Sequence, residues 1–129
     1  MALIVHKYGG TSMGSPERIR NVAKRVAKWA RAGHQMVVVP SAMSGESNRL
    51  LGLAKELAPA GQDQAYNREL DALAATGEQA SSALLAIALQ AEGMPAVSYA
   101  GMPSACSAMA SKALEACSPV AARASSSRL

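Results

Sequence analysis

The chain has 129 residues, of which 50% are hydrophobic and 17% are charged, a composition typical of one globular domain and not of a disordered segment. Its two cysteines, Cys106 and Cys117, have no histidine near them in the sequence, so neither a zinc site nor a redox pair is predicted. The formal net charge of +4 makes nucleic acid a partner to be considered.

The first predicted element is a strand over Leu3 to Lys7, followed by two glycines and two hydroxyl side chains. Glycines let backbone N–H groups approach an anion closely, and Lys7 supplies a positive charge beside Gly9 and Gly10. In a P-loop the lysine follows the glycines, and a dinucleotide loop needs G-x-G-x-x-G, so neither template fits. The pattern indicates a phosphate site of another kind, with an ordinary tight turn as the alternative.

A helix is predicted to begin at Ser15-Pro16, a capping residue followed by proline, and to end at Gly33. Its apolar stripe is formed by Ile19, Val22, Ala23, Val26 and Ala30. Its basic residues are Arg18, Arg20, Lys24, Arg25, Lys28 and Arg31. Because these cations lie on the solvated face of an amphipathic helix, and few aromatic residues accompany them, no nucleic-acid partner is expected.

A second strand is predicted over Met36 to Val39, an unbroken apolar run typical of a buried parallel strand, with Pro40 at its end. The following loop, Ser41 to Asn48, is rich in small and hydroxyl residues. These hydroxyls either bind a ligand or only stabilise turns. A helix follows the loop. Its apolar side is formed by Leu50, Leu51, Ala54 and Leu57.

Two more helices, Tyr66 to Ala74 and Glu78 to about Ala91, are predicted before a strand over Pro95 to Tyr99, with Thr76-Gly77 at the junction of the helices. The longest apolar run, Ala80 to Ala91, is too short to cross a bilayer. No secretory signal is visible, so no membrane partner and a cytoplasmic location are expected. The alternation of strands and helices predicts an α/β fold with a mostly parallel sheet, which binds ligands at the carboxyl ends of its strands.

Several motifs in this order resemble the amino-terminal part of bacterial aspartate kinases, in the amino-acid kinase superfamily. They are three: Lys7 to Ser12 with Glu17-Arg18-Ile19 after it, Ser41 to Ser47, and Ala75 to Gln79. The resemblance covers residues 1–101 and implies an α/β/α sandwich that is incomplete in this chain. It also implies transfer of the ATP γ-phosphoryl group to the side-chain carboxylate of L-aspartate. The product, 4-phospho-L-aspartate, begins the biosynthesis of lysine, threonine and methionine.

The resemblance also implies roles for individual residues. Lys7 would be catalytic, and the ATP phosphates would be held by Lys7, Tyr8, Gly9, Gly10 and Ser12. Aspartate would be bound by Ser41, Ser47 and Glu78. Mg²⁺ would accompany ATP as cofactor, with no metal ligand assigned. Ser47 has an alternative role as a helix N-cap, and Glu78, expected at a helix start, has one as an acidic residue of a first turn.

Residues 102–129 differ in character, because Ala, Ser and Cys make up 17 of these 28 residues. They are predicted to be a non-native or frameshifted tail, and the chain a truncated kinase that leaves sheet edges and apolar surface exposed. One alternative is a relative acting on glutamate or a nucleotide, which the serine loop and Thr76-Gly77-Glu78 disfavour. Another is a non-catalytic fragment that binds nucleotide phosphates or a full-length kinase subunit. A homo-oligomer is the family expectation.

Overall fold

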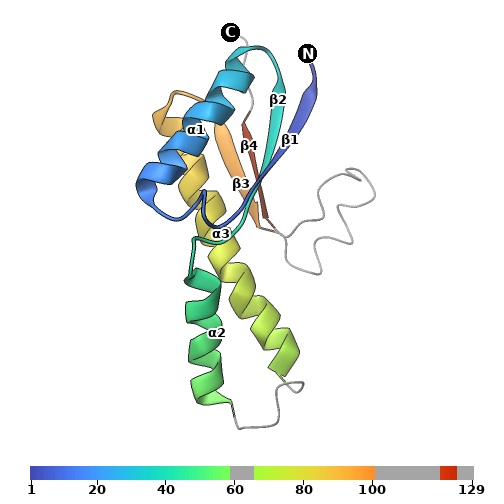
Figure 1. The fold of residues 1–129 in the computed structure, drawn as a ribbon. Coiled ribbons are helices and arrows are strands. Elements are labelled where there is room, and N and C mark those ends of the chain that lie inside the picture. The colour runs from blue at the N-terminus through green and yellow to red at the C-terminus, as the bar shows by residue number, and fades with distance from the viewer. Residues whose placement is uncertain (59–65, 101–119, 125–129) are drawn as a thin grey trace, which may run out of the picture.

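The computed structural model describes residues 1–58, 66–100 and 120–124, which form one sheet and three helices (Figure 1). In chain order the elements are β1 (Leu3–Tyr8), α1 (Pro16–Arg31), β2 (Gln35–Pro40), α2 (Glu46–Leu57), α3 (Asn67–Ala91), β3 (Ala96–Ala100) and β4 (Val120–Ala124). The predicted α/β class is confirmed, as are the first two strands and the first helix between them.

The strand order in the sheet is β1-β2-β4-β3. β1 and β2 are parallel, in a register that runs from Leu3 opposite Gln35 to Tyr8 opposite Pro40. β4 is antiparallel to both β2 and β3, so β1, β2 and β3 share one direction. The parallel strands of the predicted α/β fold are confirmed, whereas the two pairings that β4 makes are antiparallel, so the described sheet is mixed. β4 belongs to residues 102–129, for which the sequence predicted no strand.

α1 begins and ends where the sequence predicts. The Ser15 side chain accepts a hydrogen bond from the Arg18 N–H, and Pro16 occupies the first helical position. Beyond the helix, Gly33 adopts a φ of +97°, a left-handed conformation that favours glycine. The predicted apolar stripe is buried, and the basic side chains lie on the exposed face. Local signals are thus sufficient for this helix.

α3 is one continuous helix, so the prediction of two helices separated at Thr76-Gly77 is wrong. The Thr76 hydroxyl donates to the Leu73 carbonyl at 2.6 Å within the helix. Gly77 is buried in the helix interior, where a glycine costs only about 1 kcal/mol relative to alanine. Contacts of α3 with α1, α2 and the sheet offset that cost, and the helix continues.

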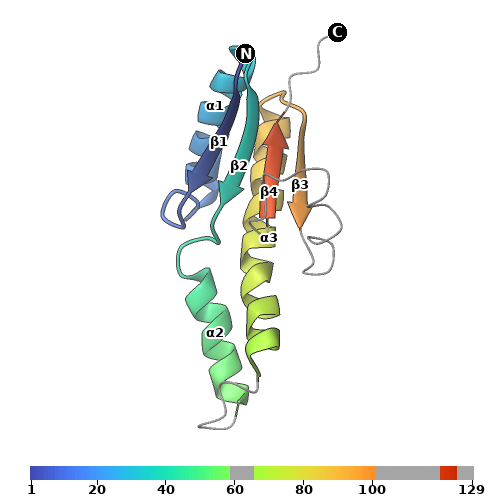
Figure 2. The same ribbon diagram turned by 90° about the vertical axis from the view of Figure 1, so that its right-hand side faces the viewer.

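α1 and α3 cover the same face of the sheet (Figure 2). The core between these layers includes Met13, Val26, Met36, Val38, Leu85 and Leu89. The other face carries half-exposed apolar side chains, among them Leu3, Val5, Val97 and Tyr99, and no helix of the described ranges covers it. The predicted exposure of apolar surface is confirmed, and the described part has two layers of the α/β/α sandwich.

α2 projects beyond the sheet beside the first half of α3 (Figure 1). Among the described elements it contacts α3 alone, and none of its residues is fully buried. Of the residues on its predicted apolar side, Leu50, Leu51 and Ala54 are half-buried, whereas Leu57 is 87% exposed. Among the described elements, the single neighbouring helix covers only part of this side of α2.

α3 has 25 residues and is long and apolar enough to cross a membrane, by length and composition only. The apolar segment estimated from the sequence, residues 80–91, is therefore shorter than this helix. The buried residues of α3, among them Ser81, Leu85 and Leu89, form one side of the helix, and 33% of its most apolar window is buried.

Ser82 provides a test of this packing. Its hydroxyl is buried and has no hydrogen-bond partner among the described residues, whereas the neighbouring Ser81 hydroxyl donates to the Gly77 carbonyl at 3.2 Å. Because an unpaired buried hydroxyl is destabilising, Ser82→Ala should raise the free energy of unfolding by about 1 kcal/mol. Ser81→Ala is the matched control and should raise the free energy of unfolding by less. Urea denaturation measures both, and a lower midpoint for Ser82→Ala would contradict the assignment.

Candidate functional site

The glycine loop after β1 is held by three backbone hydrogen bonds. The N–H groups of Ser12, Met13 and Gly14 donate to the carbonyls of Gly9, Gly10 and Thr11, at 3.1, 3.2 and 3.3 Å. In a trans peptide the N–H points opposite to the carbonyl. The N–H groups of Gly10 and Thr11 therefore point away from these turns, and within the described residues neither donates a hydrogen bond. Adjacent outward N–H groups of this kind are suited to an anion.

The second loop packs directly on the first. The Ser41 N–H donates to the Tyr8 carbonyl at 2.8 Å, which joins the ends of β1 and β2. A Cβ on Gly10 would lie 2.9 Å from the Ala42 carbonyl oxygen, closer than real side chains come, so only glycine fits. A Cβ on Gly9 would meet nothing within 4 Å. Packing between the loops thus accounts for Gly10 but not for Gly9.

The third motif reaches the same loop from α3. A Cβ on Gly77 would lie 3.1 Å from the Ala42 Cβ and 3.5 Å from the Glu46 Cγ. Ala42 therefore lies between Gly10 on one side and Gly77 on the other. The three predicted motifs meet at the carboxyl ends of β1 and β2, where the sequence placed the ligand site (Figure 1).

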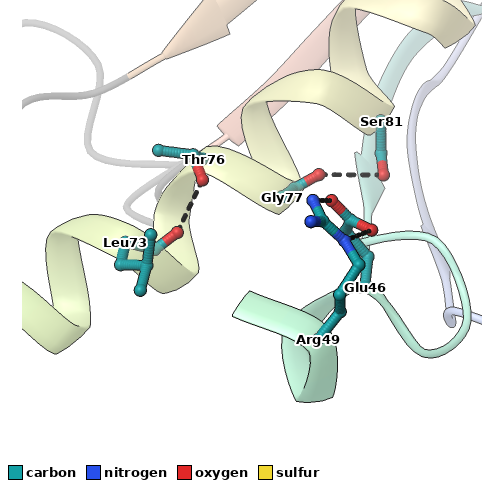
Figure 3. A network of polar contacts seen from close by, with 6 residues as sticks. All are labelled: Glu46, Arg49, Leu73, Thr76, Gly77 and Ser81. Atoms are coloured by element: carbon teal, nitrogen blue, oxygen red, sulfur yellow. Dashed lines mark hydrogen bonds and ion pairs between the residues drawn. The ribbon is translucent and has the colours of Figure 1, made fainter. Parts of the chain in front are cut away.

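The start of α2 lies beside the turn of α3 that contains Gly77 (Figure 3). The Glu46 carboxylate accepts hydrogen bonds from the Arg49 guanidinium at 2.6 and 3.0 Å. These hydrogen bonds hold the pKa of Glu46 below its ordinary value. Glu46 already has a cationic partner, whereas Glu78 makes no ion pair within the described residues.

One alternative and one prediction, for residues that the resemblance assigns to aspartate, are wrong. Ser47 is not the N-cap of α2, because Gly45 holds that position with a φ of +81° and the helix begins at Glu46. Glu78 lies in the interior of α3 and not in a first turn, so the helix dipole gives its carboxylate no advantage. Both side chains are half-buried. No hydrogen bond within the described residues joins them to each other.

Lys7 is exposed at the end of β1 and lines a pocket of about 780 Å³ along that edge strand. Ser12 instead lines a pocket of about 260 Å³ between the glycine loop and α1. Tyr8 and Arg25 border both pockets, so the pocket lined by Lys7 and the pocket lined by Ser12 are adjacent. Burial raises the pKa of Tyr8 above its usual range, and the nearby Arg25 opposes this effect.

The surroundings of these two pockets are strongly cationic. Their charged lining residues are Lys7, Arg18, Lys24, Arg25 and Lys28, and no acidic residue lines either of them. Such an environment attracts an anion such as a phosphate group. No group of three or more His, Cys, Asp or Glu side chains in the described ranges is placed to hold a metal ion.

Arg18 is the residue that sequence reasoning missed. It lies on the exposed face of α1 as predicted, and in addition its Nη1 donates to the Thr11 carbonyl at 2.8 Å, a contact that was not predicted. The available signal was its position one turn after the glycine loop, within the Glu17-Arg18-Ile19 motif. That signal does not tell whether the side chain extends into water or folds back.

Comparisons with known proteins agree with this fold. The model of the amino acid kinase family matches residues 2–117. Over 101 residues, 78% of the chain, there is 58% identity to an aspartate kinase of Pseudomonas fluorescens and 50% identity to aspartokinase 2 of Bacillus subtilis. The chain covers 24% of each, and so spans about a quarter of the length of these curated relatives.

A solved structure gives the same result for the fold. The crystal structure of aspartate kinase from Synechocystis matches with a TM-score of 0.67 and 45% sequence identity. The match covers 74% of this chain and 16% of that one. With a family model that spans most of its length and a matching fold, the chain belongs to the amino acid kinase family.

Proposed function

We propose that the described residues form part of an aspartate kinase active site, which transfers the γ-phosphoryl group of ATP to the side-chain carboxylate of L-aspartate. The product is 4-phospho-L-aspartate, and the location is cytoplasmic. The observation that carries the proposal is the meeting of the three motifs around Ala42. The identity to aspartate kinases over 101 residues supports it.

The glycine loop and Lys7 are the phosphate side of this proposal. The outward N–H groups of Gly10 and Thr11 and the Ser12 hydroxyl would donate to phosphate oxygens. Lys7 would neutralise charge on the transferring group. Phosphoryl transfer depends mainly on positioning and positive charge, and a carboxylate nucleophile needs no general base. The cationic lining of the neighbouring pockets supports this assignment.

The second loop and α3 are the aspartate side. Ser41 and Ser47 would donate hydroxyl hydrogen bonds, and Glu78 would bind the α-ammonium group of the substrate. Glu78 suits this role because Glu46, the nearby acidic residue, is paired with Arg49. The described residues offer no cluster of three or more acidic, His or Cys ligands, so none of them is proposed to hold Mg²⁺.

A second candidate function is non-catalytic binding of nucleotide phosphates or of a full-length kinase subunit. The open sheet face favours it, because apolar side chains such as Val5 and Tyr99 remain exposed there. β1 also lies at the edge of the sheet with an unpaired side. In this case a family homo-oligomer would form through the open face.

Two measurements on the 129-residue chain distinguish these functions. The first is aspartate-dependent release of ADP from ATP, and the second is ATP binding by calorimetric titration. Aspartate-dependent turnover supports the kinase. ATP binding without turnover supports the second candidate, and the absence of both contradicts any nucleotide role for the glycine loop.

Lys7→Gln tests the phosphate side. Loss of a charged donor to a phosphate should weaken ATP binding by about ten to a hundred times. The melting temperature should not change, because Lys7 is exposed. Lys55→Gln removes an exposed cation from α2 and is the matched control. If both variants bind ATP equally well, Lys7 does not contact the phosphates.

Alanine substitutions at the two adjacent glycines should have different effects on stability and on ATP binding. Gly10→Ala should lower the free energy of unfolding by about 1–3 kcal/mol, because its Cβ would press on the Ala42 carbonyl. Gly9→Ala should leave stability within about 0.5 kcal/mol and weaken ATP binding, because its Cβ enters open space where a phosphate would approach. Urea denaturation and ATP titration measure the two effects. Equal stability of the variants would contradict the loop packing.

A further inference from the structure

We infer that Arg18 is a positioning residue for the phosphate loop, an assignment that rests on the proposed function. Its Nη1 donates to the Thr11 carbonyl at 2.8 Å, across seven positions of the chain. This hydrogen bond joins the first turn of α1 to the glycine loop. A charged donor makes it stronger than a hydrogen bond between neutral groups.

The backbone of Arg18 is itself fixed. Its N–H donates to the capping Ser15 hydroxyl at 3.2 Å, and the next residue, Ile19, is 3% exposed in the core. The side chain therefore extends from an anchored helix turn, with Pro16 setting the backbone at the helix start. A donor on such a support can hold a loop more firmly than one on a mobile segment.

The carbonyl that accepts from Arg18 belongs to Thr11, the residue that also carries one of the two outward N–H groups. Thr11 oxygen accepts from both the Gly14 N–H and the Arg18 guanidinium, which fixes the peptide between residues 11 and 12. The preceding peptide carries the Thr11 N–H and is fixed through the Gly10 carbonyl by Met13. With both peptides of Thr11 held, the outward direction of its N–H is set before any anion arrives.

The guanidinium stays beside the site after making this hydrogen bond. Arg18 lines the smaller pocket together with Ser12 and Arg25. It thus adds positive charge next to the loop whose shape it sets. Arg20 lies on the same helix and is exposed, but it lines neither pocket. Arg18 and Arg20 carry the same charge, but of the two only Arg18 contacts the glycine loop, so Arg20 serves as the control.

The test compares Arg18→Gln, Arg18→Lys and Arg20→Gln with the unchanged chain. Hydrogen exchange of the Met13 and Gly14 amides, measured without nucleotide, reports the loop. ATP titration well below the melting temperature reports binding. Arg18→Gln should speed exchange of these amides several times and weaken ATP binding by about five to ten times. Arg18→Lys should restore part of both, and Arg20→Gln should change neither.

The outcomes separate the two proposals. If the unchanged chain binds ATP and Arg18→Gln binds it equally well, the positioning role is overturned while the proposed function stands. Unchanged exchange of the loop amides in Arg18→Gln also overturns it. If the unchanged chain does not bind ATP, the proposed function fails and the inference fails with it. Far-UV circular dichroism establishes that each variant is folded.

Discussion

The packing of Ala42 between two glycines is the constraint on which the site depends. Its carbonyl oxygen lies 2.9 Å from the position that a Cβ of Gly10 would take, and its methyl group lies against the surface of α3 at Gly77. A side chain at either glycine would push the second loop away from one of its neighbours. Because this loop touches both other motifs, its displacement would separate the glycine loop from α3. Gly10 and Gly77 therefore allow the close packing of these three motifs.

The elements that could be predicted from the sequence are those fixed by local chemistry. β1, α1 and β2 follow from an apolar strand, a Ser15-Pro16 start and a run of branched side chains. Thr76-Gly77 predicted a boundary because both residues are common at helix ends. In the structure the free-energy cost of a glycine inside the helix is small. The contact of Gly77 with Ala42 depends on tertiary packing that no local sequence pattern contains. The predicted placement of Glu78 at a helix start failed for the same reason.

The meeting of the two loops could be predicted from the sequence, but the directions of their side chains could not. Strand order placed the serine loop beside the glycine loop, and the Ser41 hydrogen bond to Tyr8 agrees. The sequence did not show that Lys7 and Ser12 border different pockets. It did not show that Arg18 turns back to Thr11 either, since an arginine on an amphipathic helix usually extends into water. Rotamers and loop turns decide these directions, and residue types alone do not.

The open face of the sheet bears directly on the chemistry of Lys7. Side chains alternate along β1, so Lys7 shares the uncovered face with Leu3 and Val5. Water around its ammonium group screens the charge, and this weakens its attraction for phosphate. Parallel strands are ordinarily covered on both faces, and a layer over this face would remove that water. If Lys7 contacts a phosphate as proposed, a layer that covers these apolar residues would also strengthen that contact, because it would exclude water from the ammonium group.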